Sequence, residues 1–288
     1  MPVLVEEVLQ WLKPKDGGVY VDATLGLGGH SRAILEASSP GGRVIGFEWD
    51  AQAEERARTR LAEFADRVLI VPASYTRLES ELSRLGVGEV DGLLADLGVS
   101  SLQLDSGERG FSFLADAPLD MRMDRSRDLD AAGLLAILSE SQLADLIYYY
   151  GEERQARRIA RHLVQAREEQ PIASTRQLAE LVAAAIPKKY HPRRVHVATK
   201  TFQALRIAVN GELDNIEILL KAAPAVLKPG GRMAVISFHS LEDRLVKQAI
   251  EGSDQLQAVH KKPLEARAEE IQTNPRARSA KMRVAERV

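Results

Sequence analysis

Short apolar runs that alternate with helix-like stretches constrain the fold of this chain more than any other feature. Four β-rich runs lie in the first hundred residues, at 19–22, 43–47, 68–71 and 90–95. Stretches rich in helix-forming residues separate them, at 31–37, 51–63 and 76–85. Strands that are apolar at nearly every position need cover on both faces, and the connecting helices can provide it. We therefore expect an α/β fold with a parallel sheet.

The alternation stops near Gln103 and returns only near the C-terminus. Residues 105–128 are polar and irregular, and residues 130–186 have a helical pattern with capping-box spacings that begin at Ser139 and Ser174. After a turn at 227–231, the sequence predicts strands at 233–237 and 281–285 and a helix at 241–250. The simplest organisation is a sheet domain at 1–105 and 199–288, interrupted at 106–198 by a helical insertion that recognises substrate.

Composition limits the reactions that the protein can catalyse and the compartment in which we expect it. The 288 residues include no cysteine, so disulfides, thiol catalysis and cysteine-ligated zinc are excluded. The apolar runs are too short to cross a bilayer, and the N-terminus does not have the pattern of a signal peptide. The six histidines form no sequence cluster with acidic partners, so we expect no metal site. A cytoplasmic protein without membrane contact fits best.

Charge is unevenly distributed along the chain. The net charge is −2, yet residues 152–206 carry 12 basic and five acidic side chains. Four arginines in this block recur at helical spacings of three and four and share one face: Arg154, Arg157, Arg158 and Arg161. This face predicts contact with a polyanion such as RNA, with Tyr148–Tyr150 packed inside or stacked on a base. A salt-bridged, solvated helix face remains the alternative.

A glycine-rich turn follows the first predicted strand. In the segment Val21–Ser31, glycines at 26, 28 and 29 allow a tight turn and close approach of a ligand to the backbone. Glu48 ends the second strand, where an acid can accept hydrogen bonds from ribose hydroxyls. Such a loop serves NAD and S-adenosylmethionine alike. Ser31 stands where the dinucleotide pattern has a third glycine or alanine, which favours S-adenosylmethionine.

Two further polar loops follow predicted strands. Asp96 opens the segment DLGVSS after the fourth strand, in the position where amino-group methyltransferases bring the substrate nitrogen to the methyl donor. His239 follows the strand at 233–237 and is the second candidate catalytic residue. An acid at a strand end can instead be structural, and a histidine there can instead cap a helix. Both alternatives remain open from sequence.

Long motifs in this chain resemble those of the RsmH (MraW) family, bacterial methyltransferases that act on N4 of a cytidine in 16S ribosomal RNA. The matching strings include VDATLGLGGHSRAIL at 21–35, DGLLADLGVSSLQLD at 91–105, ERGFSF at 108–113, PLDMRMD at 118–124, TFQALRIAVNGEL at 201–213 and LKPGGRMAVISFHSLEDR at 227–244. They occur in order over nearly the whole chain. The resemblance implies a Rossmann-like S-adenosylmethionine methyltransferase sheet with the helical insertion.

The resemblance also assigns site residues. It implies cofactor contacts at Gly28, Gly29, His30, Glu48, Tyr75, Asp96 and Gln103. For catalysis, the chemistry of methyl transfer to an amine makes Asp96 our first candidate and His239 our second. Glu48 replaces the usual aspartate of the family, and Tyr75 replaces a phenylalanine that can stack beside adenine. The implied partner is 16S ribosomal RNA in the small ribosomal subunit, and a homodimer is left open.

Two competing functions use the same sequence features differently. An NAD-dependent oxidoreductase could use the glycine loop, although Ser31 and the loop that begins at Asp96 favour methyl transfer. A non-catalytic RNA-binding assembly factor could keep a cofactor pocket that it no longer uses, although the intact glycine loop and the acids at the strand ends favour an enzyme.

Overall fold

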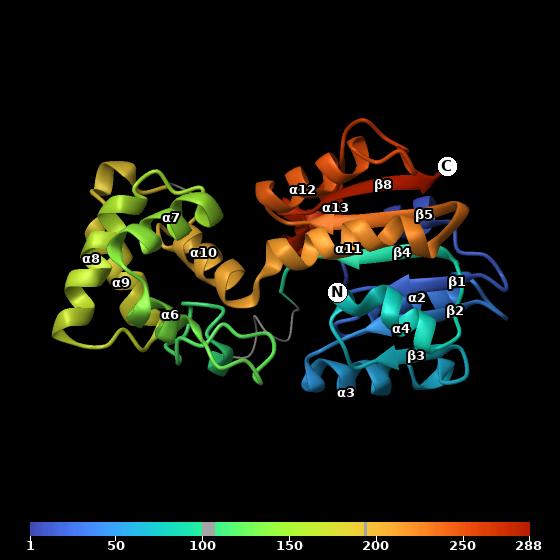
Figure 1. The fold of residues 1–288 in the computed structure, drawn as a ribbon, viewed down its shortest axis with the longest axis horizontal. Coiled ribbons are helices and arrows are strands. Elements are labelled where there is room, and N and C mark those ends of the chain that lie inside the picture. Colours follow the sequence, from blue (N-terminus) through green and yellow to red (C-terminus); the bar gives the residue numbers. More distant parts are fainter. Residues whose placement is uncertain (100–106, 193–194) are drawn as a thin grey trace. The chain divides into compact units, whose positions relative to one another are not determined.

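The computed structural model describes residues 1–99, 107–192 and 195–288 of the chain (Figure 1). The chain divides into two compact units. The sheet unit consists of residues 1–98 and 213–288, and the helical unit consists of residues 99–212. The helical unit is therefore inserted into the sequence of the sheet unit.

The sheet unit contains eight described strands in the order β3-β2-β1-β4-β5-β8-β6, with β7 paired to β8. Their bounds are β1 (Val19–Asp22), β2 (Arg43–Phe47), β3 (Val68–Val71), β4 (Val90–Asp96), β5 (Leu227–Ser237), β6 (Leu256–Ala258), β7 (Leu264–Glu265) and β8 (Lys281–Arg287). Strands β1 to β5 pair in parallel, and β8 lies antiparallel to β5. The prediction of an α/β, Rossmann-like sheet is confirmed.

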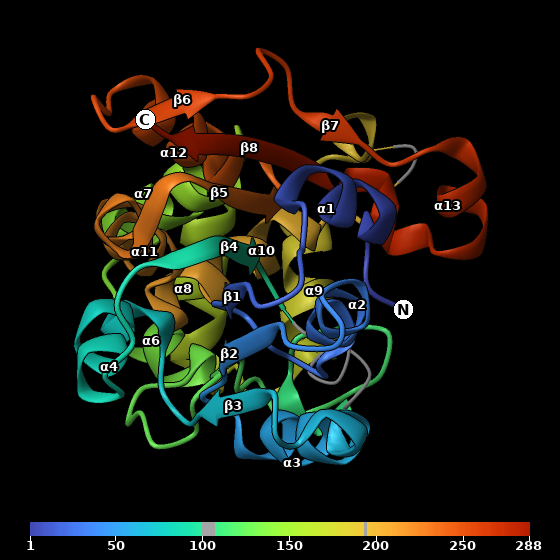
Figure 2. The same cartoon turned by 90° about the vertical axis from the view of Figure 1, so that its right-hand side faces the viewer.

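Helices cover both faces of this sheet (Figure 2). One face packs against α4 (Leu78–Arg84), α11 (Glu212–Val226) and α12 (Ser240–Glu251). The other packs against α1 (Val5–Leu12), α2 (Gly29–Ala37) and α3 (Ala51–Arg60). Two separate apolar clusters result, one on each side of the central strands, which are buried at most positions. This double cover explains why their sequences are continuously apolar rather than alternating.

Several element bounds agree with the sequence prediction and others differ. Strands β1, β2 and β3 have the predicted bounds. Strand β5 begins at Leu227, inside the segment that we expected to be a turn, because Leu227 pairs with Val90 before the register shifts. Helix α1 and the short α13 (Ala268–Thr273) were not predicted. Both are short elements that gain stability from packing rather than from propensity.

The helical unit has its own core. Its helices are α6 (Ala131–Ile137), α7 (Glu140–Gly151), α8 (Ala156–Glu169), α9 (Thr175–Ala185) and α10 (Thr199–Asn210). Helix α7 packs against α8 and α10, and Phe202 on α10 meets the edge of the Phe113 ring at 4.9 Å between centroids. This packing places α10 in the helical unit, whereas the sequence boundary at residue 198 assigned it to the sheet domain.

Buried polar groups hold the irregular segment before α6. Arg109, which is 4% exposed, donates to the carbonyls of Arg122 and Met123 at 3.0 Å each. The Asn210 side chain accepts from the N–H of Met123 at 2.8 Å and donates to the carbonyl of Met121 at 2.8 Å. The ERGFSF and PLDMRMD motifs therefore contribute to a hydrogen-bonded loop structure that α10 completes.

Among the described residues, no helix combines the length and the apolar character needed to cross a membrane.

Candidate active site

The candidate site lies at the carboxyl ends of the parallel strands. Strand β1 pairs with β2 on one side and with β4 on the other, so the chain order reverses at β1. In open α/β sheets, ligands bind outside the strand ends at such a reversal. The glycine loop follows β1, Glu48 follows β2 and Asp96 ends β4, so the sheet brings three predicted features to one edge.

The glycine loop has a backbone that requires glycine at two positions. Gly26 and Gly28 have φ values of 52° and 74°, in the left-handed region that a side chain disfavours. Gly28 is the N-cap of α2, and its N–H donates to the carbonyl of Leu25 at 2.8 Å. A Cβ on Gly29 would lie 3.0 Å from Pro2. The loop therefore turns tightly into the start of α2, with Pro2 packed against Gly29.

Glu48 fixes the loop from the neighbouring strand. Its Oε2 accepts the N–H of Gly26 at 2.9 Å, and its Oε1 accepts the N–H of Asp50 at 2.8 Å. Burial, with the nearby Asp50 carboxylate, raises the pKa of Glu48 to about 7. Each carboxylate oxygen has a second lone pair, so Glu48 can still accept hydroxyl donors from a ribose. The sequence predicted the ribose role but not the hydrogen bond to the loop.

Asp22 is a buried acid that the sequence analysis did not select. Its Oδ2 accepts the hydroxyl of Ser31 at 2.7 Å, and its Oδ1 accepts the N–H of Thr24 at 3.2 Å. Burial raises the pKa of this carboxyl, while the His30 charge and the two hydrogen bonds lower it. The Ser31 that departs from the dinucleotide pattern is thus bonded to the acid that ends β1. An acid at the end of a buried strand was the signal that could have identified Asp22.

Asp96 and His30 lie next to each other. The distance from His30 Nδ1 to Asp96 Oδ2 is 3.6 Å, and the His30 ring is 6% exposed. The backbone N–H of Asp96 donates to Thr24 Oγ1 at 2.6 Å. Burial raises the pKa of Asp96 to about 6, and the carboxylates of Asp22 and Glu242 add to that rise while His30 opposes it. A carboxyl that titrates this close to neutrality is suited to proton transfer.

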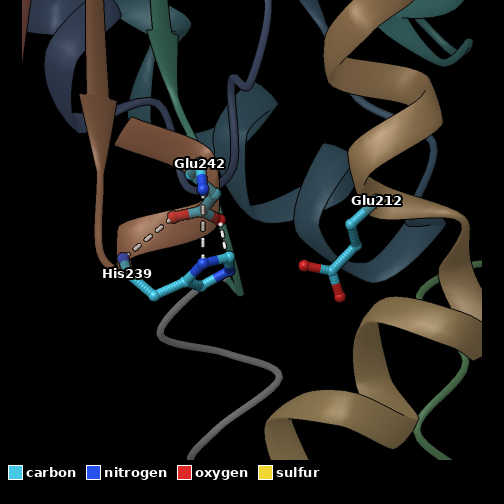
Figure 3. Close-up of side chains that lie close together, drawn as sticks. All are labelled: Glu212, His239 and Glu242. Carbon is cyan, nitrogen blue, oxygen red and sulfur yellow. Dashed lines mark hydrogen bonds and ion pairs between the residues drawn. The ribbon is translucent and has the colours of Figure 1, made fainter. Parts of the chain in front are cut away.

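His239 caps α12 in a reciprocal capping box (Figure 3). Its Nδ1 accepts the N–H of Glu242 at 3.4 Å, and Glu242 Oε2 accepts the N–H groups of His239 and Phe238 at 3.2 and 2.7 Å. The His239 Nε2 lies 3.2 Å from Glu242 Oε1. A Cβ on Gly98 would lie 3.5 Å from the Phe238 ring, so the loops after β4 and β5 are neighbours. The structure therefore shows the capping role that the sequence left open.

Tyr75 and Gln103 are the remaining residues that the sequence predicted for the site. Tyr75 begins the 3₁₀ turn η2 (Tyr75–Arg77) after β3 and packs partly buried against the sheet core. Its position after a parallel strand puts it at the same edge of the sheet as the glycine loop. Gln103 lies outside the described residues.

Comparison with known proteins identifies the family. The MraW methylase family matches residues 1–288, the whole chain. The chain is 51% identical over 286 residues to ribosomal RNA small subunit methyltransferase H of Desulfotalea psychrophila, covering 99% of this chain and 97% of that protein. It is 54% identical over 289 residues to the protein of the same name from Sorangium cellulosum, covering 99% and 90%.

Among solved structures, TrmN from Thermus thermophilus matches 99% of this chain and 48% of its own, with a TM-score of 0.48 and 14% identity. The two sequence relatives cover nearly all of both chains at about half identity. The chain therefore belongs to the MraW methylase family, the family that its sequence motifs resemble.

Proposed function

We propose that this methylase transfers a methyl group from S-adenosylmethionine to N4 of a cytidine in 16S ribosomal RNA of the small ribosomal subunit. Relatives at about half identity are named as small-subunit ribosomal RNA methyltransferases, which supports this substrate. The structural observation that best supports the proposal concerns Asp96, because its buried Oδ1 has no hydrogen-bond partner among the described residues. Because ribosomal RNA is the substrate, the cytoplasm is the proposed compartment.

The residues at the sheet edge fit the cofactor. Gly28 and Gly29 present backbone at the start of α2, His30 follows them, and Glu48 offers lone pairs to ribose hydroxyls. Tyr75 can stack beside the adenine from the next strand end. Gln103 is proposed as a further contact from the resemblance alone. S-adenosylmethionine supplies an activated methyl group, so the protein has to bind, orient and accept a proton.

Asp96 is the proposed proton acceptor. The lone pair of the cytosine amino group is delocalised into the ring, so the nitrogen is a poor nucleophile. A carboxylate that accepts its N–H orients the amine and takes the proton that the reaction releases. Asp96 ends β4, and its N–H is fixed by Thr24, so its position is set by the sheet rather than by a free loop.

His239 is proposed to orient the target base beside this acid. Its Nδ1 is occupied by the N–H of Glu242, and the Glu242 carboxylate holds the backbone of its loop. A Cβ on Gly98 would contact the Phe238 ring, so the loops that carry Asp96 and His239 are neighbours, which supports this role. A ring held in this way is better suited to positioning than to carrying a proton to solvent.

The helical unit is proposed to hold the RNA. On α8, the buried residues Ala156, Ile159, Ala160 and Leu163 face the core, and the exposed arginines occupy the opposite face. Arg154 lies in the turn before α8, so only Arg157, Arg158 and Arg161 of the four predicted arginines are on this helix. Arg161 lies 3.5 Å from Glu140, whereas Arg154, Arg157 and Arg158 have no ion pair with any described residue.

Two aromatic side chains lie close in sequence to these arginines. Tyr148 and Tyr149, at the end of α7, are 54% and 64% exposed, with ring centroids 5.2 Å apart. They are therefore not core residues. Exposed rings and exposed arginines in one stretch of sequence are a combination that suits single-stranded RNA, because rings stack on bases and arginines pair with phosphates.

Methyl incorporation tests the proposed function. Small subunits from a strain that lacks the protein are incubated with the purified enzyme and labelled S-adenosylmethionine, and the 16S RNA is mapped by mass spectrometry. We expect one added methyl group on N4 of a cytidine. Label in another base, or none with a cofactor-binding enzyme, would contradict the proposal; the second result would favour a non-catalytic assembly factor.

A further inference from the structure

His30 is oriented by the backbone of the N-terminal residues. Its Nε2 lies 2.8 Å from the carbonyl oxygen of Val3, and this bond is buried. A carbonyl oxygen only accepts hydrogen bonds, so Nε2 carries the hydrogen. The other ring nitrogen, Nδ1, is thereby directed at Asp96 Oδ2, 3.6 Å away. The ring connects a backbone carbonyl near the N-terminus to the acid at the end of β4.

The two oxygens of Asp96 have different surroundings. Oδ2 faces the His30 ring, while Oδ1 is buried and has no hydrogen-bond partner among the described residues. A buried carboxylate oxygen without a partner is costly to keep, because its desolvation is not compensated. Such an oxygen indicates a donor that arrives with a ligand.

The charges around Asp96 oppose its ionisation. Asp22 on β1 and Glu242 on α12 act on it as like charges, and burial acts in the same direction. His30 on α2 is the neighbour that acts in the opposite direction. A protonated Asp96 could not accept a proton from substrate, so a positively charged His30 ring is the group that favours the ionised, active form of the acid.

We propose that His30 is a positioning residue for Asp96. Both groups that face its ring nitrogens are acceptors, so the ring in its doubly protonated form donates from Nε2 to the Val3 carbonyl, turns Nδ1–H toward Oδ2 and leaves Oδ1 as the atom that accepts the substrate N–H. This inference rests on the proposed function for the identity of the donor. As the amine lone pair bonds to the methyl carbon, the carbon–sulfur electron pair returns to sulfur, and the N–H proton passes to Oδ1.

The N-terminal residues are part of this arrangement. Pro2 lies over Gly29, and the N–H of Leu4 donates to Glu270 Oε1 on α13 at 2.7 Å. The Asn274 side chain donates to the carbonyl of Met1 at 3.2 Å. These contacts fix the Val3 carbonyl and hence the His30 ring. They give the otherwise unassigned α13 segment a role in positioning the acid.

Nuclear magnetic resonance of the full chain, without cofactor or RNA, tests the proposal. With ¹⁵N-labelled histidine, we expect both ring nitrogens of His30 to carry a hydrogen at pH 7, where Asp96 is ionised. With ¹³C-labelled aspartate, we expect Asp96 to titrate near pH 6. In His30→Gln the Asp96 midpoint should rise by about one unit or more, since a positive neighbour lowers an aspartate pKa by about 1–3 units. The control His162→Gln, in the helical unit, should leave the midpoint unchanged.

An unchanged Asp96 midpoint in folded His30→Gln, or a His30 ring with a single hydrogen in the wild type at pH 7, would overturn the proposal. The measurement of the ring hydrogens needs no substitution, so it decides even if the variant fails to fold. Single-turnover rates give a second readout, because the acid limb of the pH profile should move to higher pH with the Asp96 midpoint. The resonance experiment uses no RNA, so failure to methylate 16S RNA would contradict the proposed function and not the His30 assignment.

Discussion

Polar groups at the edge of the sheet and on the surface of the helical unit are arranged in opposite ways. At the sheet edge, internal hydrogen bonds hold the carboxylates of Asp22 and Glu48 and the backbone N–H of Asp96, and burial raises the pKa values of all three acids. On α8, Arg157 and Arg158 are exposed and have no ion pair with a described residue. Buried charges are little screened by salt but respond to pH, whereas exposed arginines respond to salt and keep their charge. The first arrangement suits chemistry and the second suits docking of a polyanion.

The largest effect should come from removing the proton acceptor. Asp96→Asn keeps the size of the side chain but loses the anionic acceptor, so single-turnover methylation should slow by about 10²–10⁴-fold. Calorimetric affinity for S-adenosylmethionine should change little. As a control, Asp243→Asn removes a carboxylate that pairs with Arg283 and should leave the rate near wild type. A normal rate in folded Asp96→Asn would show that Asp96 only supports the fold, and it would contradict the assignment of the chemistry to the sheet edge.

Glu48 provides a test of the pH response. Its pKa rises from 4.5 unfolded to about 7 folded, so its contribution to stability is full below pH 4.5 and is lost as pH rises through 7. The loss amounts to about 3 kcal/mol. The neutral side chain of Glu48→Gln does not titrate, so the stability of this variant relative to wild type should increase by about that amount between pH 4.5 and 8. Urea unfolding across this range measures it, and a pH-independent difference would contradict the raised pKa.

Glu48 also tests whether the sheet edge binds the cofactor. Glu48→Ala removes the acceptor for Gly26 and for ribose hydroxyls, so S-adenosylmethionine should bind more weakly by about 1.5–3 kcal/mol. Isothermal titration calorimetry measures the change. Glu54→Ala, which removes only a surface partner of Arg58, is the matched control and should bind normally. Unchanged affinity in a folded Glu48→Ala protein would show that this acid serves the loop fold alone.

The smallest expected effect concerns salt. Changing Arg157 and Arg158 together to Gln should reduce the slope of log affinity against log salt for single-stranded RNA by about 1.4, or about 0.7 per arginine. Arg161→Gln should change the slope less than either single change, because Arg161 already pairs with Glu140. Cofactor affinity should stay constant in all these variants. An unchanged slope in the double variant would leave this face structural and direct the search for the RNA path to Lys188 and Lys189.

The sequence by itself determined the sheet and the location of its ligand-binding edge. Continuous apolar runs at 19–22, 43–47 and 68–71 became strands with those bounds, because buried strands are specified by local composition and length. Glu48 after the second run and Asp96 after the fourth followed from the same pattern, since the residue after a buried strand lies at the edge of the sheet, whereas Asp22 was not selected. Ser139 and Gln142 likewise form both hydrogen bonds of the predicted capping box, because this motif depends only on neighbours along the chain.

Tertiary structure decided which atoms these residues use. The bond from His30 to the Val3 carbonyl spans 27 residues, and the bond from Gly26 to Glu48 spans 22, so neither follows from local propensity. They arise because parallel pairing of β1 with β2 and β4 brings separate loops to one edge, and because the N-terminal residues lie over the glycine loop. Burial then shifts the pKa of each acid, and burial is a property of the packed structure and not of the residue type.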